Sequence, residues 1–573
     1  MNGAQALVEE LLQYKTEVIF GLPGDTSIDL YDALLSTNGR IRHIVARDER
    51  SAAFMADVYA RLTGKPGICE GPSGGGATYM LPGVVEAHGS SVSLIALTTD
   101  NPIDYEAQGA LTALDQPDIF ASVTKWATRV PRADMLPRFI RRAFRLSTTG
   151  RPGAVHLALP KDVLAQEVPA DVALYAEDTC LTWPAHRTRP AAGDVERVAR
   201  RMLAAQRPVI VAGGGVVSSG AHAELQAVAE FLSAPVATTI NGKGSLAETH
   251  PLSLGVIGGN GGRPYANQIV QEADLVLFVG SKVSYVDTDN WRVPSQARPP
   301  AIIQIDVDPA EIGNNYMLAD GLCGDARLTL NDLAEALRQL GPAPSGRAAW
   351  LSRIAGLKAE WRAGVARQAA NVCLPIMPQC VVAELQKALP AETVLICDPG
   401  TPTPFMAAEY ELRQPGRWAS PRAQGGLGYA IPGVVGARLA RPRQPVVGLC
   451  GDGSFAISAG DLVTVARVGG PTVLILLNNR CYGWIKALQK FQRGGRYFSV
   501  DLDEPMDYVQ VAAGFGLPGK RVNSVQELGP ALHDALSYGS PYFIEIPTAA
   551  EHEVIPPVAP WQREATGGAQ PGK

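Results

Sequence analysis

The chain has 573 residues, of which 46% are hydrophobic and 19% are charged, and its formal net charge is −5. This length corresponds to roughly three to five domains, and the hydrophobic fraction excludes disorder as the dominant state. Because the charges are nearly balanced and form no basic stripe, we expect no nucleic-acid partner. No apolar run approaches the roughly 18 residues that a membrane span requires, so we also expect no membrane association.

The N-terminal residues already have the pattern of a folded helix. Ala4, Leu7, Val8 and Leu11 recur at helical spacing, and neither a basic leader nor an apolar signal region precedes them. The eight cysteines contain no CxxC pair, and several lie in strand-like apolar runs. We therefore predict a cytoplasmic protein with free thiols, without disulfides or a zinc site.

Short apolar runs, each followed by a glycine-containing turn, alternate with amphipathic helical runs along the chain. Such strand-like runs lie at residues 17–24, 92–100, 208–215, 274–281, 301–308, 393–400, 445–453 and 472–479. This alternation is typical of parallel α/β sheets. Two proline-containing seams, at 182–194 and 341–346, predict domains at 1–180, 190–340 and 372–555, followed by a loosely held tail. The first and third domains share a strand–turn–helix–strand layout.

Two polar turns in the third domain carry the most specific signal. Gly451-Asp452-Gly453-Ser454 ends one strand, and Asn479 ends the next strand 27 residues after Asp452. A strand–helix–strand unit takes about 30 residues and returns parallel to its start, so both turns reach the same sheet edge. Carboxylate and amide oxygens suit Mg²⁺ or Ca²⁺, and glycines let main-chain N–H groups approach a phosphate. The residues predict a metal–diphosphate clamp, although they fit an ordinary strand-to-helix turn equally well.

The two turns resemble the thiamine-diphosphate (ThDP) motif of the acetolactate synthase, pyruvate decarboxylase and benzoylformate decarboxylase family. Further family-like blocks precede these turns, in the order of the family, at residues 21–25, 47–67, 72–78, 124–130, 151–163, 241–255 and 424–433. The resemblance extends over most of the chain. It implies an α/β fold of three doubly wound parallel-sheet domains: a pyrimidine-binding domain, a central Rossmann-like domain and a diphosphate-binding domain.

The resemblance also implies roles for individual residues. Mg²⁺ is expected between Asp452, Asn479 and the main-chain carbonyl of Cys481, against the cofactor diphosphate. The carboxyl group of Glu49 would bind the pyrimidine ring and promote removal of the thiazolium C2 proton, helped by a raised pKa in an apolar site. The residues expected to contact ThDP are Glu49, Thr401, Gly425, Leu427, Gly451, Gly453, Ser454, Asn479 and Tyr482.

The same family implies partners and raises the question of a second cofactor, FAD. Its pyrimidine and diphosphate domains come from different subunits, so a homodimer or homotetramer with active sites at subunit interfaces is expected. Some members hold FAD in the central domain. Here the glycines at 213–215 do not form GxGxxG and no acidic ribose ligand is evident, so we expect FAD to be absent.

The substrate pocket fits no single family member. Asp25, Thr112 and Gln116 are its polar candidates, with Asp25 and Thr112 in catalytic roles, and Trp484 and Ile485 are expected as its walls. Few proton donors favour carboligation, in which a 2-oxo acid is decarboxylated and its acyl unit passes to a carbonyl acceptor. The alternatives are a simple decarboxylase of an aromatic 2-oxo acid, a lyase acting on an acyl-CoA or acyloin, and a non-catalytic ThDP-binding homologue.

Overall fold

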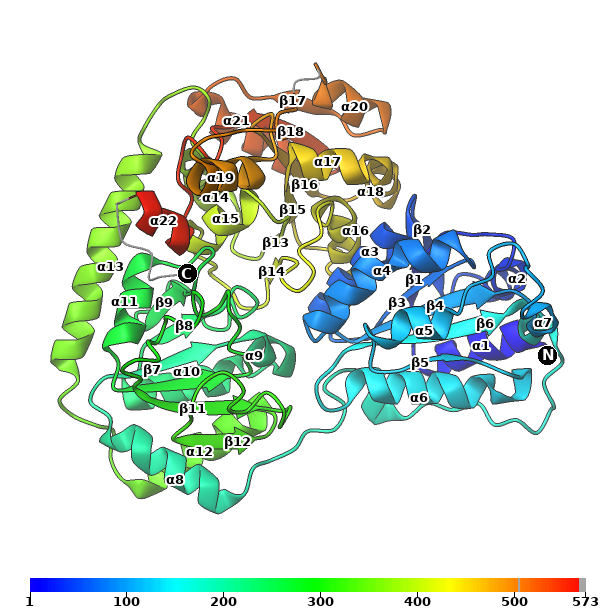
Figure 1. The fold of residues 1–573 in the computed structure, drawn as a ribbon, viewed down its shortest axis with the longest axis horizontal. Helices are drawn as coiled ribbons and strands as arrows, with labels where there is room; N and C mark the ends of the chain where they lie inside the picture. The colour runs from blue at the N-terminus through cyan, green and yellow to red at the C-terminus, as the bar shows by residue number, and fades with distance from the viewer. Residues whose placement is uncertain (503–504, 566–573) are drawn as a thin grey trace.

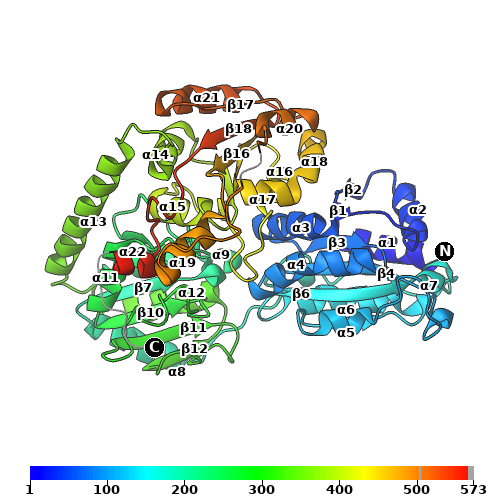
Figure 2. The ribbon, with the colours of Figure 1, turned by 45° about the horizontal axis from the view of Figure 1, so that its top comes forward.

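The computed structural model describes residues 1–502 and 505–565. They form three six-stranded sheets, each entirely parallel and flanked by helices, which confirms the predicted α/β class. In Figure 1 the first sheet lies on the right in blue, the central sheet at the lower left in green, and the third sheet above it. Figure 2 shows the third domain lying over the other two.

The first sheet has the order β2-β1-β3-β4-β6-β5. Its strands are β1 (Val18–Gly21), β2 (Arg42–Val45), β3 (Gly67–Gly71), β4 (Leu94–Asp100), β5 (Ala127–Arg129) and β6 (Ala154–Pro160). Its helices are α1 (Gly3–Gln13), α2 (Ile28–Ser36), α3 (Glu49–Thr63), α4 (Gly75–Gly89), α5 (Gln116–Ala121), α6 (Leu136–Thr148) and α7 (Lys161–Ala165).

The central sheet has the order β12-β11-β10-β7-β8-β9, which is the Rossmann order and agrees with the expected Rossmann-like domain. Its strands are β7 (Pro208–Ala212), β8 (Val236–Thr238), β9 (Ser253–Val256), β10 (Leu275–Val279), β11 (Ala301–Asp306) and β12 (Asp320–Cys323). Its helices are α8 (Ala192–Ala204), α9 (Gly214–Ser219), α10 (His222–Leu232), α11 (Pro264–Glu272) and α12 (Ala326–Leu340), and α13 (Ala348–Ala369) leads onward.

The third sheet, β14-β13-β15-β16-β18-β17, repeats the order of the first sheet strand for strand. Its strands are β13 (Val394–Cys397), β14 (Trp418–Ala419), β15 (Val446–Gly451), β16 (Thr472–Asn478), β17 (Gly519–Arg521) and β18 (Tyr542–Pro547). Its helices are α14 (Pro378–Ala388), α15 (Pro402–Glu409), α16 (Ala430–Ala440), α17 (Asp452–Ser458), α18 (Leu462–Val468), α19 (Gly483–Arg493), α20 (Tyr508–Gly514), α21 (Val525–Ser537) and α22 (Ala559–Ala565).

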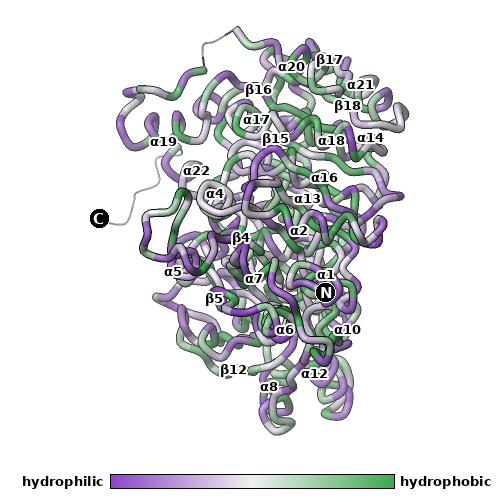
Figure 3. The backbone as a smooth tube through the Cα atoms, turned by 90° about the vertical axis from the view of Figure 1, so that its right-hand side faces the viewer, coloured by the Kyte–Doolittle hydropathy of each residue, from purple (hydrophilic) through white to green (hydrophobic). Residues whose placement is uncertain are grey.

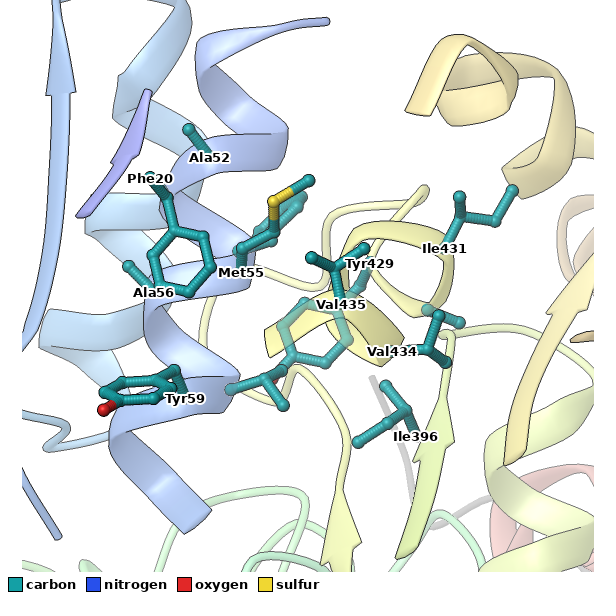
Figure 4. Close-up of a cluster of buried hydrophobic side chains, with 14 of the residues drawn as sticks. Phe20, Ala52, Met55, Ala56, Tyr59, Ile396, Tyr429, Ile431, Val434 and Val435 are labelled. Carbon is teal, nitrogen blue, oxygen red and sulfur yellow. The ribbon is translucent and has the colours of Figure 1, made fainter. Parts of the chain in front are cut away.

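Helices α3 and α16 pack together and join the first domain to the third. Close approach is possible because α16 carries glycine at the contact: a Cβ at Gly436 would overlap the main-chain carbonyl of Met55. Buried apolar side chains from both domains form one continuous core here (Figure 4). Those labelled are Phe20, Ala52, Met55, Ala56 and Tyr59 from the first domain and Ile396, Tyr429, Ile431, Val434 and Val435 from the third.

A buried ionic cluster joins the central domain to α15. Lys243 donates to Glu248 (2.5 Å) and to the main-chain carbonyls of Ala407 (3.0 Å) and Tyr410 (2.7 Å). Arg263 donates to the second oxygen of Glu248 (3.2 Å). All three charged side chains are fully buried, so each charge depends on these partners.

Polar and apolar residues are closely mixed along the coloured part of the tube in Figure 3. Within the described residues, no helix is both long and apolar enough to cross a membrane. The eight cysteines are free, as predicted, and Cys323 is the exposed one.

The tail was predicted to be loosely held, but its first part is packed against the third domain. Trp561 of α22 lies on Trp484 of α19, with ring centroids 4.4 Å apart. Residues 566–573 of the tail lie outside the described residues.

Candidate functional site

The two polar turns of the third domain meet at the carboxyl edge of its sheet. Gly451 ends β15, Asp452 begins α17, and β16 pairs with β15 and ends at Asn478. Asp452 is 2% exposed. Its Oδ1 accepts a hydrogen bond from the N–H of Gly453 (2.8 Å), and its Oδ2 accepts one from the N–H of Arg480 (2.6 Å). The turns are therefore tied directly to each other, and burial raises the pKa of Asp452 to about 6.

The amide of Asn479 has distinct partners at its two ends. Its Oδ1 accepts from the N–H of Cys481 (3.2 Å), whereas its Nδ2 donates to the hydroxyl of Thr401 (3.3 Å). Thr401 reaches this point because it immediately precedes α15 in the connection that follows the nearby strand β13. The main-chain carbonyl of Cys481 accepts from the N–H of Gly483 (2.8 Å). The structure thus brings Thr401, Asp452, Asn479 and Cys481 together.

Glu551 is a member of this site that the sequence did not indicate. It lies in the turn after β18, the strand beside β16, and is 1% exposed. Its Oε1 accepts from the hydroxyl of Thr401, and its Oε2 accepts from Nδ2 of Asn479 (3.0 Å). Burial, with a contribution from Asp452, raises the pKa of Glu551. The only sequence feature that could have indicated Glu551 is its place in the turn that follows a strand.

Asp398 is a fully buried carboxyl just after the end of β13, near the turn that carries Ser454. The nearby hydroxyl of Ser454 favours the charged form of this carboxyl and so opposes the effect of burial on its pKa. Asp398 also accepts from the N–H of Tyr429 (2.7 Å). Burial raises the pKa of Asp398 to about 7. This aspartate connects the Ser454 turn to the loop before α16.

That loop carries two of the predicted cofactor residues. Gly425 is exposed and has φ +69, a left-handed conformation that favours glycine, and Leu427 is half-buried. Tyr482, a third predicted contact, is partly exposed in front of α19 and packs on the glycine turn. A Cβ at Gly453 would lie 2.7 Å from Cε1 of Tyr482.

Glu49 is the first residue of α3 and is 4% exposed. Asp48 caps the helix by accepting from the N–H of Arg50 (2.8 Å), which sets the point where the helix begins. A Cβ at Gly76 would lie 3.1 Å from Oε1 of Glu49, so glycine keeps space beside the carboxyl. Burial, together with the nearby carboxylates of Asp48 and Glu70, raises the pKa of Glu49 in the direction expected from the sequence.

Hydroxyl groups connect the candidate substrate-binding residues of the first domain. Thr112 has φ +64, and its Oγ1 lies 2.7 Å from Oγ of Ser73. The N–H of Ser73 donates to Oγ1 of Thr26 (3.1 Å), the residue after Asp25, which itself is exposed. Gln116 was predicted wrongly as a pocket residue. It is fully buried and donates to the main-chain carbonyl of Thr99 (3.1 Å), so it supports the sheet edge from within.

The two residues expected to form pocket walls, Ile485 and Trp484, lie in different surroundings. Ile485 is exposed on α19, as a wall residue would be before a partner or substrate covers it. Trp484 instead packs against Trp561 and belongs to the apolar cluster that holds α22 on α19. Trp484 is half-buried in that cluster, and its role as a pocket wall stays a prediction.

A cavity of about 230 Å³ lies at the carboxyl edge of the central sheet. Gly214, Gly215, Lys282 and Arg151 line it, together with Asp306 at the end of β11. Burial raises the pKa of Asp306 to about 6. The sequence patterns had not singled out this carboxylate.

The donor set at the third sheet edge fits a hard cation and a diphosphate. Asp452 and Asn479 offer oxygen ligands, and the N–H groups of the glycine turn face the same edge. Among the described residues, no group of three or more His, Cys, Asp or Glu side chains is arranged for a metal. A metal here therefore depends on amide and carbonyl oxygens as well as on Asp452.

Three family models match the chain in order. The N-terminal TPP binding domain of the thiamine pyrophosphate (TPP, or ThDP) enzymes matches residues 1–119, their central domain matches 195–333, and their C-terminal TPP binding domain matches 398–546. The chain belongs to the thiamine pyrophosphate enzyme family. Each of the three matches falls on a different one of the three sheets of this family member.

Relatives of this thiamine pyrophosphate enzyme cover its full length. It is 33% identical to a probable acetolactate synthase large subunit of Methanocaldococcus jannaschii, over 98% of this chain and 94% of that protein. It is 32% identical to one of Methanococcus aeolicus over the same shares, and 30% identical to the acetolactate synthase isozyme 3 large subunit of Escherichia coli K12, over 94% of this chain and 92% of that protein. The chain is a ThDP-dependent enzyme similar to acetolactate synthases.

Proposed function

We propose that this enzyme decarboxylates a 2-oxo acid and transfers the acyl unit to a carbonyl acceptor, with Mg²⁺ holding the cofactor diphosphate. The observation that carries the proposal is the hydrogen bond from Arg480 to Asp452, which brings Asp452 and Asn479 to one sheet edge. Full-length similarity to proteins named acetolactate synthase supports the reaction type. When bound, ThDP supplies an electron sink for the pair released by decarboxylation.

The residues of the third domain would hold the cofactor and its metal. Asp452, Oδ1 of Asn479 and the carbonyl of Cys481 would bind Mg²⁺, and Thr401 would lie beside the diphosphate. The main-chain groups of Gly451, Gly453 and Ser454 would line the diphosphate. In front of them, Leu427 would support the bent cofactor, the carbonyl of Gly425 would accept from the pyrimidine amino group, and Tyr482 would cover the glycine turn.

Glu49 would hold and release the proton that drives cofactor activation. Its carboxyl group is buried and its pKa is raised, which favours the protonated form that can share a proton with a ring nitrogen of the pyrimidine. The absence of a side chain at Gly76 leaves room for a ring beside the carboxyl. These features support a catalytic Glu49 and count against a non-catalytic homologue.

We further propose that each active site uses Glu49 of a second copy of the chain. Glu86 accepts from the N–H groups of the loop before Gly425 and also pairs with Arg61 (3.2 Å) near the C-terminal end of α3. Glu49 is the first residue of that helix, about 18 Å from Arg61 along the helix axis. The proposal of a homodimer or homotetramer with sites at subunit interfaces is supported by membership of a family in which the pyrimidine and diphosphate domains of one site come from different subunits.

The hydroxyl groups around Thr112 support carboligation over simple decarboxylation. Ser73 and Thr26 are weak acids compared with a histidine or carboxyl group, so they protonate a reacting carbon slowly. Slow protonation leaves time for an acceptor carbonyl to react. Asp25 would be the acid nearest to this group, and Thr112 would position the acceptor.

The central domain lacks the usual glycine fingerprint of a dinucleotide site. The glycines at 213–215, at the carboxyl edge of the central sheet, do not form GxGxxG, which favours a central domain without FAD. We therefore propose that the reaction proceeds without FAD. A purified protein without flavin absorption in visible light would agree with this proposal, and a stoichiometric flavin would contradict it.

The main proposal is tested by incubating the purified protein with ThDP, Mg²⁺ and pyruvate and following the products by proton NMR. Acetolactate or a mixed acyloin is the expected result. Acetaldehyde alone would support the decarboxylase alternative, and cofactor binding without turnover of pyruvate or larger 2-oxo acids would support the non-catalytic one. An Asp452→Asn variant serves as the control for cofactor-dependent turnover.

A further inference from the structure

The carboxyl group of Glu551 contacts both Thr401 and Asn479, although Glu551 lies outside the predicted cofactor set. It accepts from the hydroxyl of Thr401 and, at 3.0 Å, from Nδ2 of Asn479. A carboxyl group that is 1% exposed requires hydrogen bonds to offset the loss of water, and these two bonds supply them. The placement of Glu551 is therefore coupled to the orientation of both partners.

The orientation of Asn479 matters because its amide has two unlike ends of similar size. Only the oxygen end can bind a cation, and packing alone distinguishes the ends poorly. A carboxylate accepts hydrogen bonds, so Glu551 selects the Nδ2 end of the amide. Oδ1 is left on the opposite side, where it lies 3.2 Å from the main-chain nitrogen of Cys481.

The fit around Glu551 leaves little freedom for the carboxyl group. A Cβ at Gly483 would overlap Oε2 of Glu551 and would lie 2.8 Å from Nδ2 of Asn479. Glycine at this position therefore makes room for the Glu551–Asn479 contact. The glutamate comes from the turn after β18 and the amide from the turn after β16, two strands that pair directly.

We propose that Glu551 is the positioning residue of the metal site: it keeps Oδ1 of Asn479 directed at the cation and the hydroxyl of Thr401 in place beside the diphosphate. This inference rests on the proposed function, because it assumes that Mg²⁺ and ThDP bind at this sheet edge. Residues that orient metal ligands typically contribute a factor of about 10 to 100 in metal affinity.

The test is the Mg²⁺ concentration that gives half-maximal ThDP binding to the full-length protein, measured by equilibrium dialysis with labelled ThDP. Glu551→Gln can donate as well as accept, so it no longer selects one end of the Asn479 amide. We expect it to raise the half-saturating Mg²⁺ concentration about 10- to 100-fold. The control is Glu553→Gln, which removes the same charge from an exposed side chain two residues away and should leave the value unchanged.

A double-mutant cycle separates positioning of Asn479 from other roles. In an Asn479→Ala background, Glu551→Gln should add little to the Mg²⁺ requirement, because no amide remains to orient. An equal effect in both backgrounds, or no effect in the native background, would overturn the proposal. If Glu551→Gln does not fold, Glu551→Asp, which keeps the charge but is too short to reach Asn479, should raise the Mg²⁺ requirement in its place. A native protein that binds no ThDP with Mg²⁺ would instead refute the proposed function.

Discussion

Glu86 accepts a hydrogen bond of 2.8 Å from the main-chain N–H of Gln424, although the two residues are 338 positions apart in the chain. The same carboxyl group accepts from the N–H groups of Arg422 (2.9 Å) and Ala423 (3.0 Å). Burial alone would raise the pKa of Glu86, but Arg61 and these donors hold it below its ordinary value. One buried carboxylate of the first domain thus fixes the loop that carries Gly425 in the third.

Replacing Glu86 with Ala should destabilise the protein and weaken cofactor binding together. The change leaves Arg61 and three main-chain N–H groups without this acceptor, at a cost of about 3–5 kcal/mol in unfolding free energy. Thermal unfolding of the apo protein and ThDP titration measure the two effects. As a control, Glu9→Ala removes an exposed pair with Arg40 and should cost less than about 1 kcal/mol. Equal losses in the two variants would contradict the prediction.

Asp398 should make stability fall as pH rises. Its pKa in the folded protein is about 7, above the ordinary value of 3.8, so the folded state keeps a proton that the unfolded state releases. The resulting stabilisation is complete below about pH 4 and is lost as pH rises through about 7. Asp398→Asn resembles the protonated form at every pH. Its unfolding free energy relative to the native protein should therefore increase with pH by up to about 4 kcal/mol.

Denaturant unfolding of both proteins at several pH values between about 4 and 8 measures this difference. A difference that does not change with pH would mean that Asp398 is ionised in the folded protein throughout that range.

Active sites shared between two chains should permit complementation. Glu49→Gln and Asp452→Ala are each expected to abolish activity. In a mixed dimer, one site contains both substitutions and the other contains neither, so co-expression should restore about a quarter of native activity. Activity of the unfractionated mixture measures this quarter, and mixed dimers co-purified through a different tag on each chain should show about half of native activity. Complete inactivity of a mixed dimer that does form would place each site within one chain.

Gly453→Ala should weaken ThDP binding through a steric contact with Tyr482. The new Cβ would lie 2.7 Å from Cε1 of the ring, and overpacking of this kind costs about 1–3 kcal/mol, or about tenfold in affinity. Gly356→Ala on α13 is the control, because a Cβ there meets no atom within 4 Å. Unchanged ThDP affinity in Gly453→Ala would show that the ring moves without affecting the cofactor.

Asp25→Ala should change the ratio of carboligation product to free aldehyde. Asp25 is exposed beside the Thr26–Ser73 hydroxyl contact, where it can supply a proton to the reacting centre. Without it, protonation slows further and the aldehyde fraction should fall several-fold. Product analysis by proton NMR measures the ratio, with Asp32→Ala, an exposed aspartate on α2, as the control. An unchanged ratio would count against Asp25 as a proton relay.

The sequence predicted those parts of the site that depend on one strand–helix–strand unit. The spacing between Asp452 and Asn479 placed both at one sheet edge because a single crossover determines their relation. The strands themselves were predictable from apolar runs followed by glycine turns. The repeated strand order of the first and third sheets agrees with the shared layout seen in the sequence.

Contacts that depend on strand order or on distant segments were not predictable in this way. Glu551 reaches Asn479 only because β18 pairs with β16, and Asp398 reaches Ser454 only because β13 pairs with β15. Gln116 had a suitable residue type for a pocket, but the main-chain carbonyl of Thr99 engages it inside the fold. In each case the contacting residue is brought there by the fold. The spacing of residues along the chain does not predict such a contact.

The buried cluster of Lys243, Glu248 and Arg263 has a consequence for recombination between relatives. Two acceptors of Lys243 are main-chain carbonyls of Ala407 and Tyr410, which belong to the third domain. If the central domain were exchanged at the seam before α13, the buried ammonium group of Lys243 would meet the end of a helix from a different protein. The unit that can be transplanted is therefore the central domain together with α15. Chimaeras designed on the sheet boundaries alone would separate the Lys243 charge from the carbonyls that stabilise it.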